Sequence, residues 1–184
     1  MCSITALLQA QGTTDADRAL ALDVSKSQRH RGPDWSGVFQ CEFGILSHER
    51  LAIVDVSSGA QPLIDPETGV ALAVNGEIYN HRAIRKDVTY PFQTGSDCEV
   101  ILALHREGDR EAWNRLHGMF GFVLLDPRDG SWVIGRDPIG IIPLYYGHDA
   151  EGRLLVASEM KGLANQCDDV QEFPPGHVWY STDD

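Results

Sequence analysis

Short apolar-rich stretches bounded by turn-forming residues recur along this chain, and in the first of them hydrophobic and polar positions alternate loosely, a pattern typical of strands. The first such stretch covers residues 2–9 and ends at Gln11-Gly12. Turn-forming residues at 126–130 and 148–152 separate the later stretches into hairpin-like pairs. The remaining predicted strands are 37–41, 43–47, 51–55, 70–74, 120–125, 132–135, 144–146 and 154–157.

Helical periodicity is confined to four segments. Residues 13–15 offer caps for a helix that runs to about Gln28, and Asn80 offers one for a short helix beginning at 81. Ser96 is a candidate cap for a helix over 97–107 that Gly108 ends, and 111–116 reads as a further helix. Many strands with a few helices predict an α+β protein of antiparallel sheets covered by helices, with the sheet order left open.

Length and charge narrow the class of protein. A chain of 184 residues is enough for one domain with a substantial core. The formal charge of −12 and the absence of a basic stripe argue against nucleic acid and anionic membranes as partners. The apolar run over 4–8 is too short for a membrane span or a secretory signal. A cytoplasmic location is therefore the expectation, and the four scattered cysteines indicate neither a disulfide framework nor a zinc site.

Conventional catalytic motifs are missing, but a cysteine follows the initial methionine. Cys2 has a small side chain, so removal of Met1 would leave its thiol and a free α-amine on one residue. Free cysteine has a pKa of about 8.5 and an α-amine one of about 7.7–8.0, so the amine can accept the thiol proton near neutral pH. By position alone, the commoner role is favoured, in which Cys2 is simply the first residue of a buried strand.

Acyl transfer at such a thiol needs an oxyanion hole and groups that hold the substrate. Asn75-Gly76 supplies a side-chain amide next to an approachable backbone N–H, although an Asn-Gly pair by itself is more typical of a hairpin turn. Arg50 is a candidate for binding a carboxylate, and Asp97 or Glu77 for binding an ammonium. Taken singly, each of these charged residues is more simply explained as an ordinary solvent-exposed side chain.

Taken together, the motifs are similar to those of a known family. They resemble the glutaminase domain of glutamine-dependent asparagine synthetase of the bacterial B type, a class II glutamine amidotransferase. The likeness runs in order along the chain. Its motifs are Met1-Cys2-Ser3-Ile4, residues 29–34 (RHRGPD), 48–55 (HERLAIVD), 75–80 (NGEIYN), 95–99 (GSDCE), 135–137 with 140–145 (GRD, GIIPLY), 157–161 (ASEMK) and 173–176 (FPPG).

The resemblance implies a fold, a reaction and a set of roles. The fold would be the four-layer αββα N-terminal-nucleophile hydrolase fold. Cys2 would attack the side-chain amide of L-glutamine and form a γ-glutamyl thioester, with its own α-amine as general base and acid. Asn75 and Gly76 would form the oxyanion hole. Substrate binding would fall to Arg50, to Asp97 and Glu77, to Asn75 and Gly76, and to the backbone near Leu51, Ile53 and Val54.

One motif of the full-length family is missing from this sequence. The pyrophosphate loop S-G-G-x-D-S of the family's ATP-dependent synthetase domain does not occur in 1–184. These residues therefore read as a single glutamine amidotransferase type-2 domain without the synthetase domain, which would act in cis or in trans. ATP and Mg²⁺ would belong to that absent domain, and no cofactor or metal is expected here. Bacterial members are commonly dimers, so a homodimer is compatible with the resemblance.

Two other functions stay open at this point. The same half-reaction would serve an amidotransferase that delivers ammonia to a different acceptor. If Met1 is retained, Cys2 has no free amine, and the chain would be a non-catalytic module that binds glutamine or docks a synthetase.

Overall fold

Two facing antiparallel sheets form the centre of the protein. The computed structural model describes residues 1–9, 12–52 and 59–183. One sheet has six strands in the order β10-β8-β9-β1-β3-β2, and the other has five in the order β11-β7-β6-β5-β4. The strands are β1 (Ser3–Leu8), β2 (Trp35–Cys41), β3 (Gly44–Arg50), β4 (Leu63–Ile64), β5 (Ala71–Ile78), β6 (Gly118–Leu125), β7 (Trp132–Arg136), β8 (Tyr145–His148), β9 (Leu154–Ala157), β10 (Asp169–Glu172) and β11 (Val178–Tyr180).

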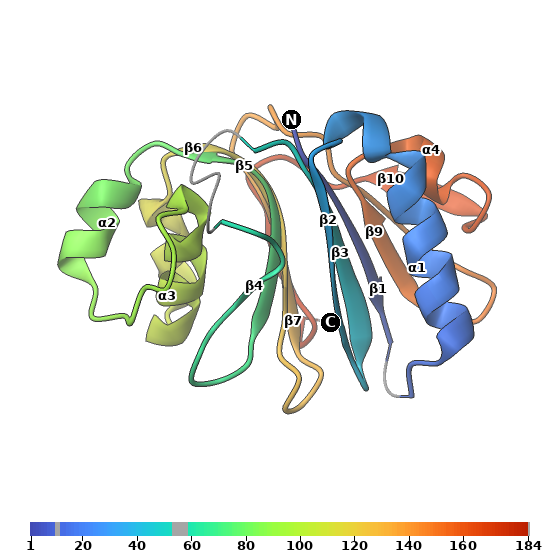
Figure 1. Cartoon of the computed structure of the whole chain (residues 1–184), viewed down its shortest axis with the longest axis horizontal. Coiled ribbons are helices and arrows are strands. Elements are labelled where there is room, and N and C mark those ends of the chain that lie inside the picture. The colour runs from blue at the N-terminus through green and yellow to red at the C-terminus, as the bar shows by residue number, and fades with distance from the viewer. Residues whose placement is uncertain (10–11, 53–58, 184) are drawn as a thin grey trace.

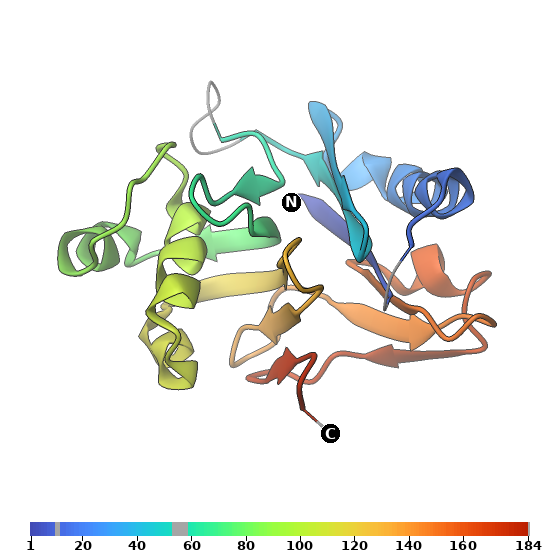
Figure 2. The same ribbon diagram turned by 90° about the horizontal axis from the view of Figure 1, so that it is seen from below.

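Helices cover the outer face of each sheet. Figure 1 shows α1 (Asp15–Ser27) and α4 (Met160–Leu163) against the six-stranded sheet, α3 (Val100–Glu107) against the five-stranded sheet, and α2 (His81–Asp87) on the far side of α3. Figure 2 shows the same separation from below. The order helix, sheet, sheet, helix confirms the predicted α+β class and the four-layer αββα architecture. Short 3₁₀ helices are η1 (Arg29–Arg31), η2 (Asp97–Glu99) and η3 (Arg110–Arg115).

Successive side chains of β1 pack into two different hydrophobic layers. Ile4, Ala6 and Leu8 are buried between the two sheets. Leu7 points the other way and packs with Ala21 of α1. Both faces of the strand are covered, which is why β1 is buried at all six positions.

β5 follows the same rule in the other sheet. Ala71 and Ala73 lie in the layer between the sheets. Leu72 and Val74 face the layer under the helices. Small residues on the inner face let the sheets approach, and larger ones fill the space beneath α3.

The helix ends agree with the predicted caps in part. The Thr14 side chain accepts a hydrogen bond from the Asp17 backbone N–H and completes a capping box at the start of α1. Gly108 ends α3 with φ 70°, in the left-handed region. Asn80 precedes α2 but does not cap it with its side chain, which instead donates to the Arg115 carbonyl. The helix expected over 111–116 is the 3₁₀ helix η3.

The hairpin interpretation of Asn75-Gly76 is wrong. β5 continues through both residues and pairs with β6 from Ala71↔Leu125 to Ile78↔Gly118. The pair therefore lies inside a strand, because a partner strand more than thirty positions away along the sequence supplies the ladder that a local motif cannot reveal.

The strand expected over 51–55 is only partly testable. Leu51 and Ala52 lie outside any strand, directly after the end of β3, and residues 53–55 fall outside the described part of the chain. The elements β4, α4, β10 and β11 were not predicted, because two to four residues are too few for a periodic signal.

Candidate active site

Three strands bring the predicted chemical groups to one end of the space between the sheets. Cys2 immediately precedes β1, in phase with the inward-facing Ile4. Arg50 ends β3, in phase with the inward-facing Leu46. Asn75 lies in β5, in phase with Ala73. Because side chains on one face of a strand recur every second residue, all three polar side chains extend the inner layer at the end where the N-terminus lies (Figure 1).

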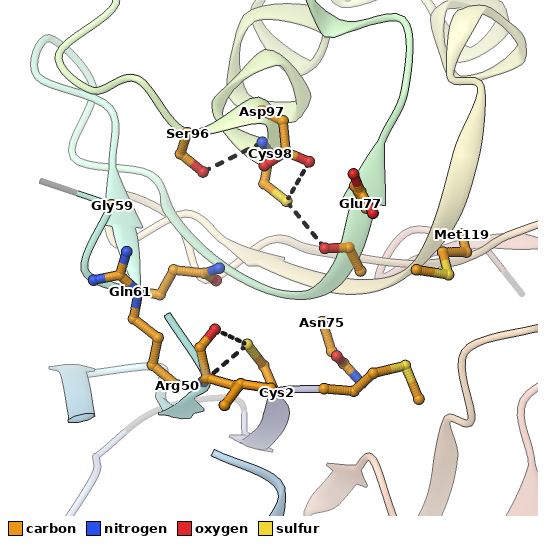
Figure 3. Close-up of a pocket in the computed structure, with 13 residues that line it drawn as sticks. Cys2, Arg50, Gly59, Gln61, Asn75, Glu77, Ser96, Asp97, Cys98 and Met119 are labelled. Atoms are coloured by element: carbon orange, nitrogen blue, oxygen red, sulfur yellow. Dashed lines mark hydrogen bonds between the residues drawn. The ribbon is translucent and has the colours of Figure 1, made fainter. Parts of the chain in front are cut away.

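A pocket opens at this place (Figure 3). Figure 3 shows Cys2 and Asn75 at one side of it, Arg50 at a second, and Asp97 with Glu77 at a third. Positive and negative side chains therefore face the same space from different directions. The lining residues are Met1, Cys2, Arg50, Leu51, Gly59, Gln61, Asn75, Gly76, Glu77, Ser96, Asp97, Cys98 and Met119.

Backbone groups surround the Cys2 sulfur. The Leu51 N–H donates to Sγ over 3.3 Å, and the thiol lies 3.6 Å from the Leu51 carbonyl oxygen. Arg31 Nε donates to the Cys2 carbonyl over 2.9 Å, and its Nη1 pairs with Glu159 at 3.0 Å. The backbone of Cys2 is thus anchored while an N–H dipole points at its sulfur, an arrangement that stabilises negative charge there.

Asn75 carries a buried amide nitrogen with no hydrogen-bond partner among the described residues. The residue is 1% exposed, and the nitrogen is its Nδ2. A buried donor without a partner costs about 1–3 kcal/mol, which a ligand that accepts its hydrogen bond would recover.

Gly76 is required by the backbone. Its φ is 152°, and a Cβ at this position would lie 2.1 Å from the Met119 carbonyl oxygen of β6. Any larger residue would force the two strands apart. Gly76 also lines the pocket.

The acidic side of the pocket is built on η2. Asp97 is buried, and its Oδ2 accepts a hydrogen bond from the Ile78 N–H over 2.7 Å. The Cys98 thiol lies 3.7 Å from the same Oδ2 and 3.8 Å from the Gly76 carbonyl oxygen. Burial and the nearby Asp97 carboxylate raise the pKa of Cys98 well above its ordinary value, so its thiol stays protonated as a donor. Glu77, one residue after Gly76, is exposed.

His48 connects the two sheets behind the pocket. Its Nε2 lies 3.0 Å from the Val74 carbonyl oxygen, and because that partner only accepts, Nε2 carries the proton. Burial lowers the pKa of His48 to about 4. The positive charge of Arg50 also lowers this pKa, whereas the hydrogen bond to Val74 raises it. The imidazole is therefore neutral at pH 7 and acts as a fixed donor.

This depressed pKa predicts a dependence of stability on pH. Between pH 6.5 and 4 the unfolded chain protonates His48 and the folded chain does not, so the free energy of unfolding falls as the pH falls. The pKa difference corresponds to about 3 kcal/mol lost over that interval. Denaturant unfolding at several pH values should show a flatter profile for His48→Gln, whose amide retains a donor, than for wild type. The exposed His148→Gln is the control, and equal slopes for His48→Gln and wild type would contradict the prediction.

The structure brings together most of the residues singled out from the sequence. Cys2, Arg50, Leu51, Asn75, Gly76, Glu77 and Asp97 all line the pocket. Ile53 and Val54 lie outside the described residues. Sequence reasoning assigned no role to Arg31, Gln61 or Cys98, although Arg31 and Cys98 fall inside motifs that carry the resemblance. The contacts of these three residues join segments that lie far apart in the chain, which no local pattern indicates.

Within residues 1–9, 12–52 and 59–183, no group of three or more His, Cys, Asp or Glu side chains is arranged to hold a metal ion. No helix in that part of the chain is long and apolar enough to cross a membrane.

Comparison with known families agrees with this geometry. Residues 1–180 match the family described as "Glutamine amidotransferase domain". The chain belongs to this family. The resemblance seen in the sequence motifs is thereby confirmed, and the pocket is the candidate active site of a glutamine amidotransferase domain.

Among curated proteins, similar sequences include asparagine synthetases. It is 51% identical to "Asparagine synthetase B [glutamine-hydrolyzing]" of Escherichia coli K12, over 100% of this chain and 33% of that protein. It is 50% identical to "Asparagine synthetase [glutamine-hydrolyzing] 3" of Arabidopsis thaliana, over 98% of this chain and 32% of that protein. The chain thus spans about a third of the length of these relatives.

Solved structures share the fold. The glutamine phosphoribosylpyrophosphate amidotransferase of B. subtilis superimposes with a TM-score of 0.81 at 20% identity, over 97% of this chain and 47% of that one. At that identity the likeness concerns the fold alone, and it confirms the predicted N-terminal-nucleophile hydrolase fold.

Proposed function

We propose that this domain hydrolyses the side-chain amide of L-glutamine to L-glutamate and ammonia at Cys2. The observation that carries the proposal is the convergence, in one pocket, of a thiol, an unpartnered buried amide donor, and opposite charges on different walls. Such a pocket matches a zwitterionic amino acid with a reactive amide. Membership of the glutamine amidotransferase family supports the same reaction.

The nucleophile is proposed to work with its own α-amine. Met1 is 48% exposed and lines the pocket beside Cys2, so its removal would free that amine within the pocket. The amine accepts the thiol proton while Sγ bonds to the amide carbon, and it then protonates the leaving nitrogen as the C–N bond breaks. Water attacks the resulting thioester and releases glutamate.

The oxyanion formed in both steps is assigned to Asn75 and Gly76. The Asn75 Nδ2 and the Gly76 N–H would donate to it, a task for which the unpartnered Nδ2 is available. Both groups belong to β5, which pairs with β6 along its length, and this pairing supports a fixed position for them.

Substrate recognition is assigned to the charged walls. Arg50 would bind the α-carboxylate, and Asp97 with Glu77 the α-ammonium. Within the described residues the contacts of the Asp97 carboxylate with the Ile78 N–H and the Cys98 thiol both end on Oδ2, and Oδ1 is assigned to the substrate. The backbone of Leu51, and of Ile53 and Val54 outside the described residues, is proposed to complete the pocket.

A wider role follows from the relatives. We assign the ammonia to asparagine synthesis, because relatives at 51% and 50% identity bear that name. In this proposal the domain, residues 1–184, works with an ATP-dependent synthetase domain that uses aspartate, in cis or in trans, and in the cytoplasm, where the Cys2 thiol stays reduced. Full-length protein supplied with glutamine, aspartate and ATP should form asparagine. Ammonia delivered to another acceptor instead would support the alternative amidotransferase.

The glutaminase proposal is tested by ammonia release combined with the intact mass of the chain. Chain without Met1 should release ammonia from glutamine. A version with an uncleavable extension before Cys2 should bind glutamine with at least ~10³-fold slower turnover, because its amine is in a peptide bond. Equal turnover by both versions, or none by either, would refute the proposal; binding without turnover would favour the non-catalytic module.

A further inference from the structure

The strand that carries Asn75 and Gly76 has an incompletely covered edge. In an antiparallel strand the N–H and C=O of one residue point the same way, and successive residues alternate. β4 pairs with β5 only at Leu63↔Leu72 and Ile64↔Ala71. Beyond Leu72, the residues that point to this edge are Val74, Gly76 and Ile78, and no described strand lies alongside them.

Side chains replace the missing strand at Val74. Gln61 Oε1 accepts the Val74 N–H over 2.8 Å, and His48 Nε2 donates to the Val74 carbonyl over 3.0 Å. Gln61 is 9% exposed and His48 is 0% exposed. The same two backbone groups that β4 would have bonded are therefore held by buried side chains.

The next residue on the same edge is Gly76. Its carbonyl faces the Cys98 thiol at 3.8 Å, and the Ile78 N–H one step further is bonded to Asp97. Gly76 pairs with Phe120 across the ladder, and the Phe120 N–H and C=O are bonded to Asp137 on the far side. The Gly76 N–H therefore points to the pocket, and its direction depends on how Val74 is held two residues earlier.

Gln61 is itself placed by close packing. A Cβ on Gly37 of β2 would lie 1.8 Å from the Gln61 carbonyl oxygen, so the bare glycine lets this segment run against the six-stranded sheet. The side chain then reaches from there to Val74 and lines the pocket (Figure 3). Because a backbone N–H needs an acceptor, the oxygen end of the Gln61 amide must face Val74.

We propose that Gln61 is a positioning residue of the oxyanion hole: by holding the Val74 N–H it directs Asn75 and the Gly76 N–H toward the oxygen of the reacting amide. This role rests on the proposed glutaminase function. It acts through the main chain of β5, so it affects stabilisation of the transition state more than binding of the substrate.

The test compares Gln61→Leu, which removes the acceptor at similar size, with Gln61→Glu, which keeps an oxygen there. For Gln61→Leu we expect kcat to fall about 10- to 100-fold with a KM for glutamine within about 3-fold of wild type. Gln61→Glu should restore most of kcat. Ser181→Ala is the matched control, since Ser181 Oγ accepts a strand N–H, that of Trp132, away from the pocket.

A second readout reports on the oxyanion hole itself. A glutamine analogue with an aldehyde in place of the amide adds the Cys2 thiol across its C=O bond, forming an S–C bond and leaving the charge or proton on oxygen. Its affinity should fall in Gln61→Leu by the same factor as kcat/KM, whereas glutamate affinity should not change.

The outcomes separate the ideas. Unchanged kcat and aldehyde affinity in Gln61→Leu, with only a lower melting temperature, would overturn the inference and leave the glutaminase intact. A raised KM that Gln61→Glu does not rescue would mean direct contact with the substrate, and would also overturn it. A wild-type domain that releases no ammonia from glutamine would refute the proposed function and this inference with it.

Discussion

Replacement of Cys2 by alanine is expected to abolish glutamine hydrolysis, with a loss of at least ~10³-fold in kcat. Among the residues that line the pocket the other thiol is that of Cys98, and it cannot substitute because it is buried and its pKa is raised well above the ordinary value. Alanine is small like cysteine, so processing of Met1 should continue. The measurement is ammonia release from glutamine by purified domain of verified mass.

The fold should tolerate this change. Cys2 precedes β1, and the described side-chain contacts that alanine would remove are those of the sulfur with the Leu51 backbone. The melting temperature should therefore stay close to that of wild type. Cys41→Ala, which removes a partly buried thiol from β2, is the control and should keep full activity. Residual turnover in Cys2→Ala comparable with Cys41→Ala would overturn the assignment of the nucleophile.

Asn75→Ala has the second-largest expected effect, a fall in kcat of about 10²- to 10³-fold with little change in KM. The amide would donate only to the oxyanion, so its loss reduces stabilisation of the transition state and leaves the affinity for the substrate nearly unchanged. Steady-state kinetics with glutamine measures both parameters.

The stability of Asn75→Ala distinguishes this account from a structural role. Removing a buried polar group usually destabilises a protein because its partner is left unpaired. Here Nδ2 has no partner within the described residues, so the free energy of unfolding should not decrease. Asn114→Ala, at an exposed amide bonded to Glu111, controls for the loss of an amide. A raised KM at constant kcat, or a large loss of stability, would contradict the oxyanion assignment.

Local signals were sufficient for much of the fold. The loose alternation in 2–9, bounded by Gln11-Gly12, predicted the strand β1, because a strand pattern depends on residues close together in the sequence. The Thr14 cap and the Gly108 terminus were predictable since capping depends on residues within one turn.

Long-range pairing set the limits of sequence-based prediction. Asn75-Gly76 carries a hairpin signal, and only the β6 partner makes it a strand interior. Gln61 reaches Val74 only because Gly37, in a different sheet, lets its backbone pass closely. The resemblance of motifs identified most residues that line the pocket. It did not identify Gln61 and His48, the side chains that hold β5 at Val74.

The central claim is that Cys2, with a free α-amine, forms a γ-glutamyl thioester. The most direct measurement is the intact mass of the domain quenched in acid during turnover of glutamine, followed by peptide mapping of the adduct. The account predicts one added γ-glutamyl group, located on Cys2 of chain that lacks Met1. Ammonia release without that adduct, an adduct on another residue, or full activity of chain that retains Met1 would contradict it.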